Sequence, residues 1–291
     1  MATEDRNPAT LQIDTLDAAG ICALLHAEDA AAFTAVGRVL PAVARAAAAA
    51  AGALAAGGRL LYAGAGTSGR LCVLDASELP PTFGLDPARA RALLAGGSAA
   101  MTAAVEGAED DRSRGTADVA AAAPAPPDLL LAVAASGRTP YVLAAAAEAR
   151  RRGATTVGVL CNPGAPLEAA VDIAVVPDTG AEALLGSTRM KAATAQMMVL
   201  RMISTAALVL DGHVYSNLLV DMRPSNRKLE ERAARMIALA TGCRSEEAAD
   251  ALAAAGGEVK TAIALRVLGV PAAEARRRLA AAGGRLRGVI P

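Results

Sequence analysis

The sequence predicts an α/β fold with a mostly parallel sheet that is covered by helices on both faces. Five short apolar runs alternate with segments of helical periodicity, which is typical of β-α-β units. The chain has 291 residues, of which 54% are hydrophobic and 20% are charged, enough for one large core and a smaller appendage. The predicted strands are residues 60–63, 92–95, 129–134, 155–160 and 173–176.

Helices are predicted before, between and after these strands. One helix covers residues 15–26, capped by Asp14 or Thr15, and a longer one runs from about residue 30 to residue 56, before Gly57-Gly58. Further helices cover residues 141–152 and 188–210, followed by a charged helix over residues 227–240 and three short helices within residues 245–286. The short helices are separated near Gly256-Gly257 and Gly269-Val270-Pro271. Two domains are therefore expected, residues 1–238 and residues 239–291.

Charge and cysteine content narrow the range of partners and compartments. Twenty-nine basic and 29 acidic residues give a net charge of zero, so no overall field favours nucleic acid or an anionic membrane. The first seven residues lack the basic and apolar parts of a secretory signal. The four cysteines are far apart, which favours free thiols in a reducing cytoplasm. We expect a cytoplasmic protein that binds neither nucleic acid nor membrane.

A glycine-rich loop after the first predicted strand is the strongest local signal. Residues 64–70, Gly-Ala-Gly-Thr-Ser-Gly-Arg, separate the strand from a helix. Glycines allow positive φ and let backbone N–H groups approach a ligand, while a helix start carries partial positive charge. Together with the backbone of Gly66 and the hydroxyls of Thr67 and Ser68, these features predict a phosphate site.

Two nucleotide-binding patterns share this spacing but lack their other requirements. Gly64, Gly66 and Gly69 fit the dinucleotide pattern, which expects an acidic residue after the next strand, where Gly96-Gly97 stands instead. A P-loop requires Lys and a hydroxyl residue where Arg70-Leu71 stands. A plain connecting turn remains the alternative.

The other predicted strands end in similar polar segments. Because ligands of parallel α/β folds bind beyond the carboxyl ends of the strands, these segments are expected to meet in one crevice. Helix capping explains any single hydroxyl in these segments. It does not explain why hydroxyls recur together with glycine and a nearby cation at the ends of three strands. A phosphorylated small molecule with many hydroxyls is the expected ligand. The candidate contacts beyond the first loop are Ser136, Gly137, Arg138, Thr139, Asn162, Ser187, Thr188 and Lys191, with Arg189 as a further cation.

At this point several segments carry a resemblance to a known family. They are Thr3-Glu4-x-Arg6-Asn7, residues 59–84, residues 104–111, residues 134–141, Cys161-Asn162-Pro163, residues 186–191 with Thr194-Ala195-Gln196, and residues 214–221. The second of these ends in Asp75-Ala76-Ser77-Glu78-Leu79-Pro80-Pro81-Thr82-Phe83-Gly84. In this order they cover nearly the whole chain. The chain resembles the N-acetylmuramic acid 6-phosphate etherases of the sugar-isomerase (SIS) superfamily, which implies a three-layer αβα SIS-type sandwich.

The resemblance implies a lyase reaction in amino-sugar metabolism and peptidoglycan recycling. The D-lactyl ether at C3 of N-acetylmuramic acid 6-phosphate is cleaved to N-acetylglucosamine 6-phosphate and D-lactate, with no metal and no other cofactor. After the ring opens, a base removes the C2 proton and an acid protonates the departing ether oxygen. Such an acid needs a raised pKa, usually from burial.

Two glutamates are carried over from the family as catalytic residues. Glu78 is the expected proton donor and Glu109 the second carboxyl group. From the sequence alone, Glu106 competes with Glu109, since the two stand one helical turn apart. His26 and His213 are expected to be structural. The chain departs from the family at Leu79, Ala181 and Ala193, which bears on packing more than on reaction class.

Two other functions remain open, and both would use the same phosphate site. A hexosamine-phosphate isomerase would need a carboxylate base but no acid at C3. A non-catalytic regulator would bind the sugar phosphate without turnover, and Arg276-Arg277-Arg278 would then be its partner surface rather than a solvated helix end. SIS domains commonly dimerise, so the resemblance also implies a homodimer.

Overall fold

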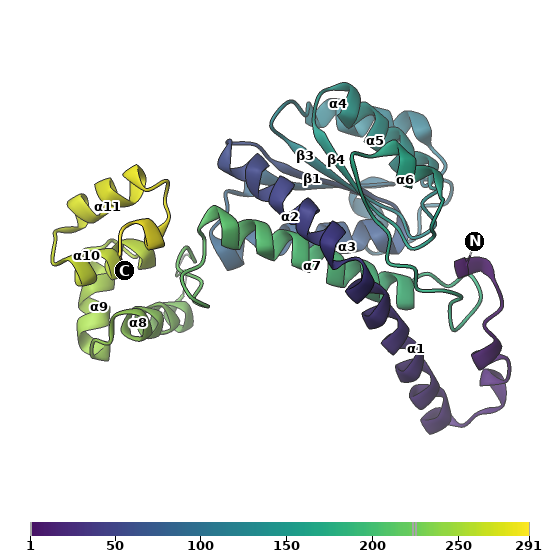
Figure 1. Cartoon of the computed structure of the whole chain (residues 1–291), viewed down its shortest axis with the longest axis horizontal. Coiled ribbons are helices and arrows are strands. Elements are labelled where there is room, and N and C mark those ends of the chain that lie inside the picture. The colour runs from purple at the N-terminus through teal and green to yellow at the C-terminus, as the bar shows by residue number, and fades with distance from the viewer. Residues whose placement is uncertain (1, 223, 225, 291) are drawn as a thin grey trace. The chain divides into compact units, whose positions relative to one another are not determined.

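A computed structural model of the chain describes residues 2–222, 224 and 226–290. Its centre is a five-stranded sheet in the order β2-β1-β3-β4-β5, with every neighbouring pair parallel (Figure 1). The α/β prediction is confirmed, and each predicted strand is found with ends displaced by two residues or fewer. The strands are β1 Leu60–Gly64, β2 Ala90–Leu94, β3 Leu129–Val133, β4 Thr155–Val159 and β5 Ile173–Val175.

The central strands are continuous apolar runs because both faces of the sheet are covered. Every residue of β1 and β3 is buried. Helix α2 (Leu40–Ala55) packs on one face, and α5 (Pro140–Arg151) packs on the other beside α4 and α6 (Figure 1). The core on the α5 face includes Leu61, Leu130 and Ala145. This arrangement is the three-layer sandwich that the sequence predicts.

The remaining helices are placed along the chain as follows. They are α1 Ala18–Arg38, α3 Gly66–Phe83, α4 Arg112–Ala122, α6 Pro166–Ala170, α7 Lys191–Asp211, α8 Arg227–Thr241, α9 Ser245–Ala254, α10 Val259–Leu268 and α11 Ala272–Ala281. Short 3-10 helices are η1 Ala2–Glu4, η2 Pro8–Thr10, η3 Ile13–Thr15, η4 Pro87–Arg89, η5 Gly97–Met101 and η6 Leu286–Gly288.

Helix boundaries differ from the prediction at the N-terminal end of the chain. Helix α1 begins after Asp17, whose side chain accepts a hydrogen bond from the Gly20 amide, and not at Asp14 or Thr15. It continues to Arg38, so the predicted gap before residue 30 is wrong. The break comes at Val39, because Pro41 in the first turn of α2 has no N–H for a hydrogen bond to the preceding helix.

Helix α3 contains two prolines near its C-terminal end, Pro80 and Pro81. The helix runs through both prolines to Phe83, and the Gly84 amide then donates to the carbonyl of Pro80. Burial of Leu79 and Phe83 holds this last turn in place. The stabilisation from this packing therefore outweighs the cost of the two helical hydrogen bonds that the prolines cannot donate.

A buried polar network lies among β1, α3 and α7. The carboxylate of Asp75 accepts hydrogen bonds from the Tyr62 hydroxyl at 2.9 Å and from the Ser204 hydroxyl at 3.2 Å. Burial raises the pKa of Asp75, although the two hydrogen bonds and the nearby charge of Arg201 oppose the shift. The network satisfies three polar side chains that would otherwise be unpaired in the core.

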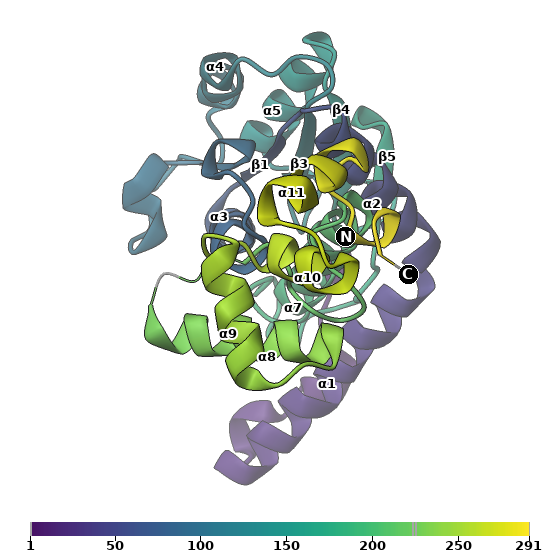
Figure 2. The same ribbon diagram turned by 90° about the vertical axis from the view of Figure 1, so that its left-hand side faces the viewer.

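The chain forms two compact units that are interleaved in sequence. The first comprises residues 1–77 and 88–207, and the second comprises residues 78–87 and 208–291. The expected boundary between residues 238 and 239 lies within α8. In the second unit, α8 to α11 pack around a core that includes Ile237, Ile263 and Leu279 (Figure 2).

Two helices, α1 and α7, are long and apolar enough to cross a membrane by length and composition. Core helices of soluble proteins pass the same criteria. Half of the apolar window of α7 is buried, against 17% of that of α1. Near the C-terminal end of α1, Phe33 is 71% exposed. The apolar surface of α1 is therefore largely free of contacts within this chain.

The C-terminal arginines are paired within their own unit. Arg276 contacts Glu258, while Arg277 and Arg278 both contact Glu274. These ion pairs support the interpretation of this cluster as a solvated helix end, because the charges are already matched by neighbouring carboxylates.

Candidate functional site

The strand order creates a switch point between β1 and β3. Along the chain, the connection after β1 leads to β2 on one side, while β3 lies on the other side of β1. In open parallel sheets, ligands bind beyond the carboxyl ends of the strands at such a point. After β1, Ala65 leads directly into α3, so the predicted glycine loop forms the first turns of that helix, and residues 134–139 follow β3.

The loop after β1 depends on its glycines for two reasons. Gly66 has φ +53°, a conformation that residues with a Cβ rarely adopt. Gly64 and Gly69 are in close contact: a Cβ on Gly69 would lie 2.7 Å from the Gly64 carbonyl oxygen and 2.4 Å from a methyl carbon of Leu94. The first turn of α3 therefore packs directly on the end of β1, and the first amides of a helix have no hydrogen-bond partner inside it.

A cavity of about 270 Å³ opens beside this turn. Its lining includes Thr67 and Arg70 of α3, and Glu106 and Glu109 of the segment before α4. The full lining comprises Ala65, Gly66, Thr67, Arg70, Ala95, Ala100, Ala103, Ala104, Val105, Glu106, Gly107, Ala108 and Glu109. The start of the predicted phosphate loop and the predicted catalytic carboxyl Glu109 thus line one cavity.

Main-chain contacts fix both sides of the cavity. The guanidinium of Arg70 donates to the carbonyl oxygens of Ala100 at 2.9 Å and Ala103 at 3.2 Å. The carbonyl of Glu109 accepts a hydrogen bond from the Tyr141 amide at 3.0 Å, at the start of α5. The loop that bears the two glutamates is therefore attached to α3 at one end and to α5 at the other.

The predicted catalytic carboxyl groups are all exposed in the single chain. Glu106 and Glu109 both line the cavity, so the geometry leaves open which of them is the second carboxyl group. Glu78 belongs to the second unit, in the last two turns of α3, and is also exposed. The burial that we expected for a general acid is thus not provided by the isolated chain.

The hydroxyl of Ser68 is directed into the protein. It donates to the side-chain oxygen of Gln196 in α7 at 2.8 Å, and Ser68 is buried. The amide nitrogen of Gln196 is buried and has no hydrogen-bond partner among the residues that the structure describes. Thr67, by contrast, lines the cavity. The two adjacent hydroxyls of the loop therefore have different surroundings.

The loop after β3 forms a tight turn before α5. The Ser136 hydroxyl accepts a hydrogen bond from the Arg138 amide at 3.1 Å. Gly137 has φ +64°, and a Cβ there would lie 2.6 Å from the Cβ of Ala165. Thr139 stands at the N-cap of α5, but its side chain makes no capping hydrogen bond within the described chain. The hydroxyl of Thr139 therefore does not cap the helix, which was the alternative to a contact with ligand. Arg138 beside it is exposed.

Asn162, after β4, is occupied by the N-terminal segment. Its amide nitrogen donates to the Thr3 hydroxyl at 3.0 Å and to the Ala135 carbonyl at 2.9 Å. Both Thr3 and Asn162 are buried. The carbonyl of Thr3 also accepts a hydrogen bond from the Gly186 amide at 3.1 Å. Asn162 thus connects the start of the chain to the loop after β3.

Lys191, another predicted substrate contact, is buried in an ion pair. Its ammonium group contacts the carboxylate of Glu28 in α1, which also accepts a hydrogen bond from the Asn7 side chain at 2.6 Å. The buried carboxylate of Glu182 accepts hydrogen bonds from the amides of Lys191 and Ala192, so it caps α7. Burial raises the pKa of Glu182.

Ser187 and Thr188 lie just before this cap. Their amides donate to the carbonyls of Leu184 and Gly186, both at 2.9 Å. Both residues are half-buried, and Arg189 beside them is exposed. The turn is therefore fixed through its main chain.

Sequence reasoning missed four residues that shape these loops. They are Glu28, Arg70, Glu182 and Gln196. Arg70 had a visible signal, because it directly follows the glycine loop. Gln196 and Glu28 lie 128 and 163 residues from their partners, Ser68 and Lys191. Glu182 lies nine residues before Lys191 and accepts a hydrogen bond from its amide. No local sequence pattern identifies partners at such separations.

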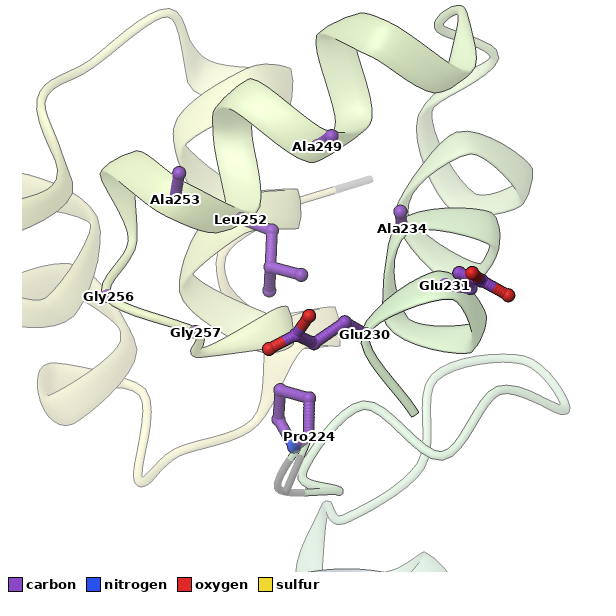
Figure 3. A pocket seen from close by; sticks show the side chains of 9 residues that line it. All are labelled: Pro224, Glu230, Glu231, Ala234, Ala249, Leu252, Ala253, Gly256 and Gly257. Carbon is purple, nitrogen blue, oxygen red and sulfur yellow. The ribbon is translucent and has the colours of Figure 1, made fainter. Parts of the chain in front are cut away.

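A second cavity, of about 530 Å³, lies within the C-terminal helices. Leu252 of α9 and Glu230 of α8 point into it above Pro224, whereas Glu231 points away (Figure 3). None of the predicted site residues lines it. Among residues 2–222, 224 and 226–290, no group of three or more His, Cys, Asp or Glu side chains is arranged to hold a metal ion.

Comparisons with known proteins agree with the fold and cover the whole chain. Models of the glucokinase regulatory protein N-terminal SIS domain and of the SIS domain match residues 42–149 and 99–206. A phosphoheptose isomerase from Francisella tularensis superposes with a TM-score of 0.50 at 21% identity, covering 64% of this chain and 95% of that chain, which supports the fold.

Full-length relatives give the closer relationship. The N-acetylmuramic acid 6-phosphate etherase of Erwinia tasmaniensis is 49% identical over 290 residues, covering 100% of this chain and 95% of the relative. That of Cutibacterium acnes is 50% identical over 285 residues, covering 98% and 94%. Identity at this level along the entire length means that this chain belongs to the family of N-acetylmuramic acid 6-phosphate etherases.

Proposed function

We propose that the protein is a carbon-oxygen lyase that cleaves the D-lactyl ether of N-acetylmuramic acid 6-phosphate. The products are N-acetylglucosamine 6-phosphate and D-lactate. The observation that carries the proposal is the cavity at the switch point, which is lined both by the start of α3 and by two glutamates. A helix N-terminus suits a phosphate, and carboxyl groups suit the proton transfers of an elimination. The identity to etherases over the full chain supports the same reaction.

The reaction proceeds by elimination and then addition. Opening of the sugar ring yields an aldehyde at C1, which acidifies the proton at C2. A base takes that proton, a double bond forms between C2 and C3, and the C3–oxygen bond breaks as an acid protonates the departing oxygen of lactate. Water then adds its hydroxyl to C3 and a proton to C2, which restores the saturated sugar. Two groups that exchange protons suffice for these steps.

The residues of this chain suggest a division of labour. Gly66 and Thr67 at the start of α3 bind the phosphate, with Ser68 holding the turn against Gln196. Glu109, or Glu106 beside it, acts at C2 or C3 from the opposite wall. Glu78 donates the proton to the departing lactate oxygen, as the family resemblance implies. Ser136, Thr139 and Ser187 remain candidate contacts to the hydroxyl groups of the sugar.

We further propose that the enzyme works as a homodimer that completes its site across subunits. A general acid near neutral pH needs a raised pKa, and burial is the usual cause. Glu78 and Glu109 are exposed in the single chain. Exposed apolar side chains on α1 and α2, such as Phe33 at 71% and Leu40 at 48%, offer a surface for a second copy. Association through this surface would bury the apolar side chains, and the proposal requires the partner subunit to cover Glu78 or Glu109.

A cytoplasmic role in recycling peptidoglycan fits the chemistry of the ligand and of the chain. All four cysteines are free, and two of them are fully buried. Free thiols are typical of a reducing compartment. A sugar phosphate is likewise an intracellular metabolite, because its charge prevents passive passage through a membrane.

The decisive experiment measures D-lactate release from N-acetylmuramic acid 6-phosphate. The purified chain is compared with Glu78→Gln, Glu109→Gln and Glu106→Gln, each checked for folding by circular dichroism. We expect release by the parent and a loss of at least about 100-fold in kcat for Glu78→Gln and Glu109→Gln, with a smaller effect of Glu106→Gln. A larger loss in Glu106→Gln would exchange the roles of these two neighbours.

Other outcomes identify the alternative functions. Binding of the sugar phosphate by a folded parent without lactate release would indicate a regulator. Interconversion of a hexosamine phosphate and its ketose would indicate an isomerase. Sedimentation at several protein concentrations tests the homodimer, and a chain that stays monomeric while fully active would contradict it.

A further inference from the structure

A cluster of charged side chains around His213 lies outside the cavity and is not used by the proposed mechanism. The imidazole Nδ1 lies 2.8 Å from the carbonyl oxygen of Phe83 and 3.0 Å from the carboxylate of Asp221. Its Nε2 lies 3.3 Å from the carboxylate of Asp211. Lys260 of α10 contacts the same Asp221 carboxylate. All five residues belong to the second unit.

This cluster is built onto the end of the helix that carries Glu78. Phe83 is the last residue of α3, and its carbonyl is one of those that a helix leaves without an internal partner. The next residue, Gly84, has φ +69°, and a Cβ on it would lie 2.0 Å from the Asp221 carbonyl oxygen. The loop at Asp221 is therefore in direct contact with the end of α3, and His213 joins the two.

The geometry favours a proton on both ring nitrogens. Each faces a carboxylate, and Nδ1 also faces a carbonyl, so a neutral ring would place a lone pair against an acceptor. Burial alone would lower the pKa of His213, but the hydrogen bonds with Asp211 and Asp221 outweigh it and raise the pKa to about 9. The other charged neighbours are Lys260 on Asp221 and Arg285, whose side-chain stem lies beside Gly212.

We propose that His213 is a positioning residue for Glu78: as an imidazolium bound to Asp211 and Asp221, it holds the last turn of α3 through the Phe83 carbonyl. The proposal rests on the proposed function, in which Glu78 is the proton donor. It differs from a purely structural role because the position of Glu78 affects the chemical step, whereas the phosphate binds at the other end of α3. Loss of the contact should therefore lower kcat and leave KM nearly unchanged.

The direction of the pH dependence follows from the raised pKa. Because the pKa in the folded state lies above its ordinary value of 6.5, the stabilisation is fully present below pH 6.5 and is lost as the pH rises through about 9. Above that pH, one ring nitrogen no longer donates, and the Phe83 carbonyl or a carboxylate loses its partner. The parent enzyme should then lose kcat in alkaline solution with a midpoint near this value.

Nuclear magnetic resonance can test the protonation state without activity, because the chain contains only two histidines. Carbon–proton spectra of the imidazole rings are recorded from pH 5 to pH 10, and His26→Gln assigns the two signals. We expect the His213 signal to titrate near pH 9. Titration of His213 near its ordinary value of 6.5 would overturn the proposal.

Kinetics with matched variants test the positioning. Lactate release is measured from pH 6 to pH 10 for the parent, His213→Gln and His26→Gln, with thermal unfolding at each pH. We expect His213→Gln to lower kcat about tenfold at pH 7, with KM within about twofold, and to abolish the alkaline fall; His26→Gln should match the parent. An active parent whose alkaline fall persists in folded His213→Gln at unchanged kcat would overturn the proposal. A parent that releases no lactate would instead remove the proposed function, and with it the role of Glu78.

Discussion

The ammonium group of Lys191 lies 2.5 Å from a carboxylate oxygen of Glu28, in an ion pair that leaves the Lys191 side chain 5% exposed. The pair joins α7 to α1 across 163 residues of sequence. Lys191 follows Ser187 and Thr188 closely in sequence, and its charge is already matched by Glu28. Lys191 therefore has a structural role in this ion pair, in addition to the contact with substrate that the sequence predicts.

A double-mutant cycle separates these two roles. Lys191→Met leaves the Glu28 carboxylate partly buried without its cation, so we expect the free energy of unfolding to fall by about 3 kcal/mol. Adding Glu28→Gln should recover much of this loss, because the amide oxygen still accepts from Asn7. Urea unfolding measures stability, and steady-state assays measure KM. A KM raised equally in the single and double variants would mean that Lys191 contacts the substrate.

The adjacent hydroxyls of Thr67 and Ser68 should respond differently to removal. Thr67 lines the cavity, so Thr67→Val should raise KM about 10-fold to 100-fold through loss of a hydrogen bond to a charged phosphate, with little effect on stability. Ser68→Ala removes the bond to buried Gln196 and should lower the free energy of unfolding by about 1 kcal/mol, with a smaller change in KM. The reverse pattern would assign the phosphate contact to Ser68.

Close packing at Gly69 should make that position intolerant of even one methyl group. Gly69→Ala would place a Cβ 2.7 Å from the Gly64 carbonyl oxygen, so the loop must shift, and we expect a loss of about 2 kcal/mol or more with a strong rise in KM. Gly52→Ala is the control, because nothing lies within 4 Å of its added Cβ inside α2. That change should raise the free energy of unfolding by about 0.5–1 kcal/mol, and with it the melting temperature. Equal effects at the two sites would contradict the packing.

Asp75 should make the core sensitive to substitution and to pH. Asp75→Ala leaves the buried hydroxyls of Tyr62 and Ser204 without their acceptor, so we expect a loss of about 2–3 kcal/mol. Asp75→Asn keeps an acceptor oxygen and should lose less. Because the pKa of Asp75 is raised, the folded state of the parent binds its proton more tightly, and its contribution to stability declines as the pH rises above 3.8.

Urea unfolding between pH 4 and pH 7 measures this contribution. Asp75→Asn has no titratable group at that position, so the part of the pH dependence of stability that is due to Asp75 should disappear. An Asn variant that retains the whole pH dependence of the parent would assign that dependence to other groups.

Local patterns in the sequence account for most of the fold. Each of the five strands is a short apolar run bounded by glycine or polar residues, and their alternation with helices requires a parallel sheet. The boundary predicted between the first two helices was wrong, because the break lies at Val39, just before Pro41, and not between residues 26 and 30. Proline has the opposite outcome in α3, which continues through Pro80-Pro81 because Leu79 and Phe83 are buried.

The cavity was predictable where its lining residues are close together in sequence. The glycine turn and Thr67 are adjacent in sequence, and the carboxyl ends of parallel strands meet at one edge, so the cavity beside α3 follows from the strand pattern. The partners of Ser68, Asn162 and Lys191 could not be found in this way, because each lies 128 to 163 residues distant. The residue types alone do not show whether these three side chains contact a ligand or another part of the protein.

The contacts of Thr3 and Asn7 have a consequence for how the chain folds. Their partners Asn162 and Ala181 lie 159 and 174 residues away, so these bonds close some of the largest loops in the chain. Closing a long loop costs entropy that only many simultaneous contacts repay, and contacts of such separation form late. The sheet can assemble from neighbouring β-α-β units first. We expect the N-terminal segment to dock last and to fix the loops after β4 and before α7, so competence to bind the sugar phosphate should appear only after the bulk of the secondary structure has formed.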